Sequence, residues 1–122
     1  MKKVSFFPRN KFGQKLACGK LTGYAFDYRG ITLVVHKWGA INGQAVWCVS
    51  EPVTGSWVFK GGMVDRELGA PKPRSRDATM ALSTQRIEDM GGVSVLREHL
   101  RIKSLLVKRA NETASEINHA QR

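Results

Sequence analysis

The fold is decided by residues 21–60, which read LTGYAFDYRGITLVVHKWGAINGQAVWCVSEPVTGSWVFK. This stretch is rich in β-branched and aromatic residues and is interrupted at short intervals by turn residues, a pattern typical of an antiparallel meander. It predicts strands near 20–28, 31–38, 45–50 and 56–60. The turns between them are supplied by Asp27–Gly30, Asn42–Gly43 and Glu51–Gly55.

The alternation of side chains within these strands predicts how the sheet is covered. Tyr24, Phe26 and Tyr28 project to one face of the first strand, because side chains alternate with a period of two. Residues 31–35 and 45–49 are apolar on both faces. The centre of the sheet must therefore be covered on both sides, by helices or by a second copy of the chain.

A loop over 61–74 and a first helix follow the meander. Scattered glycines and prolines with mixed charge predict the loop. Ser75 offers a capping hydroxyl and Asp77 an early acid, which favour a helix start there. The helix is expected to run through Met90 and to end at Gly91–Gly92.

A second helix is predicted from Val93 to about Ala110, with a tail over 111–122 that continues it or frays. Its apolar residues form two stripes on nearly opposite sides, and such a helix needs cover on two faces. One stripe comprises Val93, Leu96, Leu100 and Val107, and the other comprises Val95, Ile102 and Leu106. The strip between them carries Arg97, Arg101 and Lys108. This arrangement predicts a homodimer.

These elements predict a single α+β domain over 1–122, with a four-stranded antiparallel meander at 20–60 and two C-terminal helices within 75–120. Residues 1–19 are interpreted as a basic N-terminal arm or an edge strand, and Val4–Phe7 would then make the sheet five-stranded. No apolar run approaches the length of a membrane span. The N-terminus also lacks a signal-peptide pattern, so we expect a cytoplasmic location and no membrane partner.

No catalytic or metal-binding motif stands out, so we expect neither an enzyme nor a cofactor. Cys18 and Cys48 lack further ligands at metal spacing, and two buried free thiols are predicted. A metal or acid–base site at Asp65 and Glu67 is a weaker interpretation than a solvated loop. A small hydrolase or nuclease that depends on His36 or Asp65 remains the third hypothesis, because a triad can assemble in space.

Charge is the strongest indication of a partner. The chain has 20 Lys and Arg against 10 Asp and Glu, for a net charge of +10. Residues 1–60 carry nine basic and two acidic residues, a net +7, which places the anion-facing surface on the N-terminal side. The 72–76 segment adds basic residues just before a helix start, where free N–H groups also favour phosphate.

These observations predict a nucleic-acid-binding site in the N-terminal arm and the linker. Its predicted residues are Lys2, Lys3, Arg9, Lys11, Lys15, Lys20, Lys72, Arg74 and Arg76. Aromatic residues on the sheet are candidate stacking platforms for bases, although core packing is the commoner role. They are Tyr24, Tyr28, Trp38, Trp47 and Trp57.

Three stretches resemble small accessory proteins of phages and plasmids. They are Pro52–Gly61 (PVTGSWVFKG), Ser75–Ala78 (SRDA) and Ile87–Gly91 (IEDMG). The resemblance covers about the middle third of the chain and departs from the pattern at the 62–74 insertion. It implies the biology of a mobile element, where small proteins bind DNA or block host defence complexes, and it transfers no site residues.

The leading hypothesis is thus a non-enzymatic nucleic-acid-binding accessory protein that contacts the phosphates of DNA or RNA. The alternative is a protein-binding inhibitor of a host defence complex, of the anti-CRISPR or antirestriction type. Such an inhibitor would dock its basic surface on an acidic or nucleic-acid-binding protein, because a mimic of DNA must itself be acidic.

Overall fold

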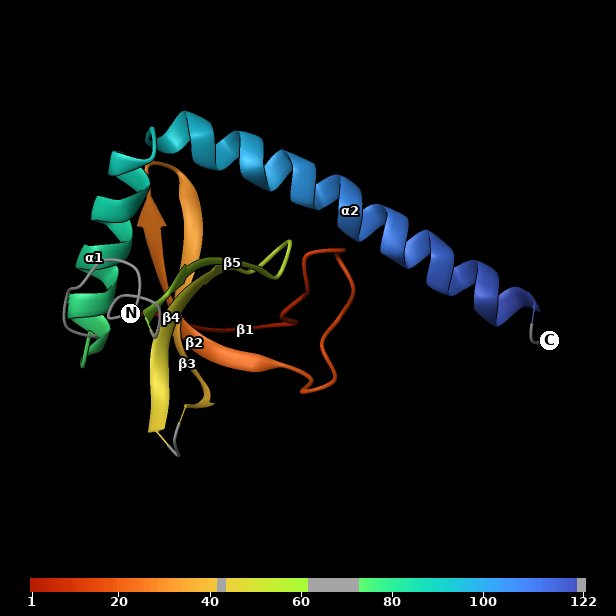
Figure 1. Ribbon diagram of the computed structural model, residues 1–122, viewed down its shortest axis with the longest axis horizontal. Helices are drawn as coiled ribbons and strands as arrows, with labels where there is room; N and C mark the ends of the chain where they lie inside the picture. The colour runs from red at the N-terminus through yellow and green to blue at the C-terminus, as the bar shows by residue number, and fades with distance from the viewer. Residues whose placement is uncertain (42–43, 62–72, 121–122) are drawn as a thin grey trace.

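A computed structural model describes residues 1–41, 44–61 and 73–120 (Figure 1). Its strands form one antiparallel sheet in the order β1-β2-β3-β4-β5. The elements are β1 (Lys3–Phe6), β2 (Leu21–Tyr28), β3 (Ile31–Ile41), β4 (Gln44–Glu51), β5 (Ser56–Lys60), α1 (Arg76–Asp89) and α2 (Val93–Ala120). The predicted α+β fold is confirmed, and β1 makes the meander five-stranded. The predicted turn at 42–43 and residues 62–72 of the predicted loop lie outside the described residues.

The β2–β3 hairpin closes through a two-residue turn. Arg29 and Gly30 both have positive φ, at 47° and 88°, which is the conformation of a type I′ turn. The carboxylate of Asp27 accepts a hydrogen bond of 3.2 Å from the backbone N–H of Gly30. The turn that the sequence predicted here therefore forms as a tight hairpin.

One face of the sheet packs on the helices. Leu33, Val35 and Val49 are fully buried on this face, beside Ile87 of α1 and Leu96 of α2. Because α1 lies along the sheet and α2 starts at its far end (Figure 1), the two helices cover only part of the face.

The opposite face is covered by the chain that follows β1. The backbone N–H of Arg9 donates to the carbonyl of Gly55, in the β4–β5 turn, at 3.0 Å. A Cβ on Gly55 would lie only 2.1 Å from the carbonyl oxygen of Phe7, so glycine is required at this crossing. Beneath it, the ring of His36 packs edge-on against Phe6 and Trp57, with centroids 5.2 and 5.9 Å apart. The sheet centre is thus buried on both sides, as its apolar pattern predicted, but on this side the N-terminal segment provides the cover instead of a helix or a second copy.

The segment between β1 and β2 folds against α2. A Cβ on Gly13 would lie 2.6 Å from the backbone of Leu106, which brings this loop into close contact with the helix. Cys18 follows in the same segment and is exposed, so the prediction of two buried thiols is wrong for this residue. The reason is that the chain here returns to β2 over the surface. Cys48 is buried in β4, and burial raises the pKa of its thiol to about 11.

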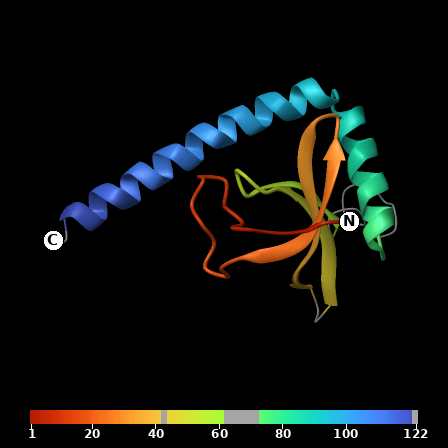
Figure 2. The same cartoon turned by 180° about the vertical axis from the view of Figure 1, so that it is seen from behind.

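The helices begin where the sequence predicted. Ser75 caps α1, and its Oγ accepts a hydrogen bond of 3.1 Å from the backbone N–H of Ala78. α2 continues through the predicted tail to Ala120 and extends well beyond the sheet, as both views show (Figures 1 and 2). No helix in the described part of the chain is long and apolar enough to cross a membrane.

Candidate nucleic-acid interface

The edge of the sheet that the helices leave open carries an ordered set of polar side chains. Lys3 pairs with Tyr24 and Ser5 pairs with Thr22 across β1 and β2. Since alternate residues share a face, these four side chains lie on the face that α1 covers farther along. Lys3, Ser5 and Thr22 are exposed, and the two hydroxyls are 2.8 Å apart.

The same face continues across β3 and β4. Tyr24 pairs with Val35, so Lys37, two residues later in β3, shares that face. Lys37 pairs in turn with Trp47 of β4, and its Nζ lies 5.2 Å from the centroid of the Trp47 ring. The exposed lysine thus stands over a half-buried ring.

Two further lysines converge on Phe7, which follows β1 on the same alternation as Lys3 and Ser5. The Nζ atoms of Lys15 and Lys20 lie 4.2 and 5.4 Å from the centroid of the Phe7 ring. Lys15 is placed there by an isolated bridge to Arg9, which folds the loop back on itself. Both lysines are exposed, and Phe7 is 36% exposed.

The start of α1 brings a cation from far along the chain to this face. The guanidinium carbon of Arg76 lies 4.8 Å from the centroid of the Tyr24 ring, and the Nζ of Lys3 lies 5.9 Å from it. The arm and the linker of the sequence-based prediction therefore meet at Tyr24. Arg76 also forms an ion pair of 3.3 Å with the exposed carboxylate of Asp77.

We call this surface the basic–aromatic face. It comprises Lys3, Lys15, Lys20, Lys37 and Arg76 with the rings of Phe7, Tyr24 and Trp47. Only two acidic residues occur in residues 1–60, Asp27 and Glu51. The Asp27 carboxylate, near the end of β2, accepts a hydrogen bond from Gly30 in the β2–β3 turn, and Glu51 is buried. Neither carboxylate forms an ion pair with a lysine of this face in the described structure.

The remaining predicted site residues lie elsewhere. The guanidinium of half-buried Arg9 donates a 2.7 Å hydrogen bond to the carbonyl of Gly13, so it holds its own loop together. Lys11 lies over Phe12 at 5.2 Å, in the loop that contacts α2. Lys2 and Arg74 are exposed without a contact to the three rings in the described structure, and Lys72 lies outside the described residues.

Of the predicted stacking residues, Tyr24 and Trp47 belong to the basic–aromatic face. Tyr28 is buried, and its hydroxyl donates a 2.7 Å hydrogen bond to Glu88 of α1. Trp38 and Trp57 pack edge-to-face, 5.1 Å apart, on the opposite side of the sheet. Sequence reasoning missed Lys37 and Phe7, although extending the two-residue alternation from the predicted strands would have placed both on the face of Tyr24.

The contact between His36 and Ser50 resembles a catalytic pair but has no access to solvent. The Nδ1 of His36 faces the carbonyl of Lys37 at 3.2 Å, and its Nε2 faces the Oγ of Ser50 at 2.8 Å. Because a carbonyl only accepts, Nδ1 carries the proton and Nε2 accepts from the Ser50 hydroxyl. Both side chains are buried, at 1% and 0% exposure, and burial lowers the pKa of His36. The pair is part of the packing of β3 against β4.

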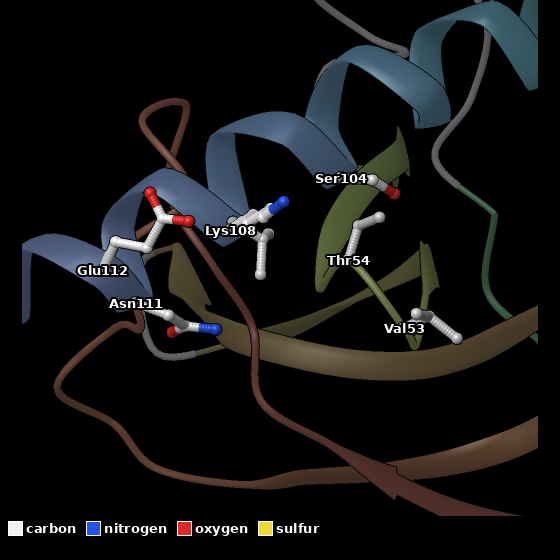
Figure 3. A pocket seen from close by; sticks show the side chains of 7 residues that line it. Val53, Thr54, Ser104, Lys108, Asn111 and Glu112 are labelled. Atoms are coloured by element: carbon white, nitrogen blue, oxygen red, sulfur yellow. The ribbon is translucent and has the colours of Figure 1, made fainter. Parts of the chain in front are cut away.

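Other features of the described chain offer less to a ligand. No cluster of three metal-ligating side chains occurs among residues 1–41, 44–61 and 73–120, and Asp65 and Glu67 lie outside these ranges. A hollow of about 460 Å³ opens between α2 and the β4–β5 turn (Figure 3). Lys108 and Glu112 of α2 both line it, so its charges offset one another.

Comparison of the chain with protein-family models, with curated proteins and with solved structures gives no match. The resemblance to phage and plasmid accessory proteins therefore stays a prediction. The case for the interface rests on its geometry.

Proposed function

We propose that this chain is a non-enzymatic protein that binds single-stranded nucleic acid on its basic–aromatic face. The observation that carries the proposal is the register of β1 to β4, which lines up Lys3, Lys37 and Tyr24 with Trp47 on one open side of the sheet. Cations beside aromatic rings are the combination that single-strand binders use, with phosphates on the cations and bases on the rings.

Single strands fit this face better than a duplex does. Paired bases in a helix hide their faces, whereas unpaired bases can stack on aromatic rings or on an arginine plane. At Tyr24 the guanidinium carbon of Arg76 already lies 4.8 Å from the ring centroid, so a planar cation and an aromatic ring stand together at one place. The lysines over Phe7 and Trp47 are exposed and flexible, so they can move from ring to phosphate as a base arrives.

The first test reverses charge on the face. In Lys20→Glu/Lys37→Glu, we expect affinity for a labelled single strand of about a dozen nucleotides to fall by at least about tenfold, measured by fluorescence anisotropy at low salt. The matched control is Lys108→Glu/Arg109→Glu, which makes the same change of net charge at exposed positions of α2. An equal loss in both variants, or no binding by the natural chain, would overturn the proposal.

The second test separates stacking from charge. Phe7→Ala should weaken single-strand binding by about tenfold and leave duplex binding unchanged, because stacking on one ring contributes about 1–3 kcal/mol per base. Phe12→Ala is the control, since Phe12 is also exposed under a lysine but lies outside the face. Equal effects of Phe7→Ala on single strands and duplexes would contradict the single-strand assignment.

A further inference from the structure

The two apolar stripes of α2 have different surroundings. Leu96 is buried and Leu100 packs against the core, so the first stripe is covered by the body of the molecule. Val95 and Ile102 of the second stripe are 45% and 47% exposed. Val95 and Ile102 therefore lie in the open, about 100° around the helix from Leu96, whereas Leu106 of the same stripe is half-buried beside the loop at Gly13.

The exposed stripe has the spacing of a coiled-coil seam. Val95, His99, Ile102 and Leu106 follow one another at intervals of four, three and four residues. This alternation repeats every seven residues and is the pattern by which two helices pair, each seam residue inserting between residues of the facing helix. Packing of α2 against its own domain requires only the first stripe, so the second seam is available to another helix.

An apolar hollow extends the seam at its N-terminal end. It has a volume of about 150 Å³ and is lined by Val58 of β5, Ile87 of α1 and Val95 of α2, among others. Met90, at its rim, is 63% exposed. Side chains of a helix lying on the seam can therefore contact the body as well as α2.

We propose that the occupant of this seam is α2 of a second copy, in parallel orientation. In a parallel pair, the residue flanking the seam on one side faces the residue five positions later in the other helix. Glu98 and Lys103 are five positions apart and flank the seam on opposite sides. Glu98 of each chain then faces Lys103 of the other, and the pairing occurs twice by symmetry.

The charges favour this orientation over the reverse one. With the same seam residues in contact, an antiparallel pair brings Glu98 opposite Leu105 instead of a cation. Within its own chain, Glu98 already accepts hydrogen bonds of 2.7 and 3.0 Å from Arg101. A carboxylate has about four acceptor sites, so a lysine of the second copy can be added without losing that contact. This proposal does not depend on nucleic-acid binding.

Sedimentation velocity of the full chain tests the pairing. The apparent mass should rise with concentration from that of one chain to that of two. Ile102→Asp should hold the chain as a monomer, because it buries a charge in the seam, whereas Val53→Asp should still dimerise. Val53 is the matched control because it is apolar and 82% exposed on the β4–β5 turn. Thermal melts by circular dichroism verify that both variants fold.

The orientation is tested by a cross-link in a Cys18→Ser background. Ile102→Cys should form a disulfide between two copies under mild oxidation, since parallel helices place position 102 opposite itself. A dimer that forms without this cross-link would overturn the parallel orientation. A natural chain that stays monomeric at all concentrations would overturn the self-association, and would leave the seam for a helix of another protein.

Discussion

The two sides of the sheet carry similar residues, but one side buries its polar groups and the other exposes its cations. On the closed side, His36, Trp38 and Trp57 pack edge-to-face, and the hydroxyl of Ser50 is bonded to His36. No buried polar side-chain atom in the described residues is without a hydrogen-bond partner. On the open side, rings again lie beside polar groups, but the cations are exposed. Residue type alone does not make a site, because availability to solvent decides whether a polar group can bind a ligand.

The difference arises from how the chain is routed. The crossing at Arg9 and Gly55 closes one side of the sheet, and α1 closes only part of the other. Substitutions of buried polar groups should therefore change the free energy of unfolding, and substitutions of the exposed cations on the open side should change binding.

The largest effect is expected at Glu51, whose buried carboxylate holds the β4–β5 turn. Its carboxylate accepts hydrogen bonds from the backbone N–H groups of Val53 and Thr54, at 3.0 and 2.7 Å, and from the Thr54 hydroxyl. Glu51→Ala should lower the free energy of unfolding by about 3 kcal/mol in urea titrations, because buried donors lose a charged acceptor. Asp27→Ala, which removes one exposed turn contact, should cost less than about 1 kcal/mol. Equal losses would contradict the difference in burial between the two carboxylates.

The next effect is a pH dependence that comes from His36. Burial lowers its pKa in the folded state, so the unfolded chain binds the proton more readily. Its contribution to stability is complete above the unfolded pKa of about 6.5 and is lost as the pH falls toward the folded value. Between pH 6.5 and 5, the free energy of unfolding should therefore fall by up to about 1.4 kcal/mol per pH unit.

The variant His36→Gln tests the origin of this slope. It should reduce the pH dependence of urea midpoints more than His99→Gln does, because burial also lowers the pKa of His99 but that side chain is exposed on α2. A slope that survives in His36→Gln would assign the titration to another group.

The sequence predicted the elements of this fold better than the contacts between them. Alternation placed the strands, and the Ser75 hydroxyl marked the start of α1, because both signals are local. The meeting of Lys3 with Arg76 at Tyr24 has no local signal, since it depends on which end of the sheet α1 covers. The exposure of Cys18 was mispredicted for the same reason, because the path of its loop is set by contact with α2.

A smaller effect is expected from two serine hydroxyls that make bonds of equal length. Ser50 Oγ lies 2.8 Å from His36 in the interior, and Ser5 Oγ lies 2.8 Å from Thr22 at the surface. Ser50→Ala should lower the free energy of unfolding by about 1 kcal/mol, since it leaves a buried ring nitrogen without a donor. Ser5→Ala should cost no more than about 0.5 kcal/mol, because water replaces the bond. The two variants would be compared by urea denaturation, and a reversed order would contradict the burial assigned to each side.

The smallest effect on stability is expected from two lysines that lie over tryptophans. Their effects on nucleic-acid binding give the most direct comparison of the two sides of the sheet. Lys37 lies 5.2 Å from the Trp47 ring on the open face, and Lys60 lies 5.2 Å from the Trp57 ring on the other. Both are exposed, so Lys37→Gln and Lys60→Gln should each cost no more than about 0.5–1 kcal/mol. Only Lys37→Gln should lower the salt dependence of single-strand binding, by about 0.7 in the slope of log K against log salt, because it removes one phosphate contact. If Lys60→Gln lowers that slope equally, the anion is bound by net charge and the open face has no special role in it.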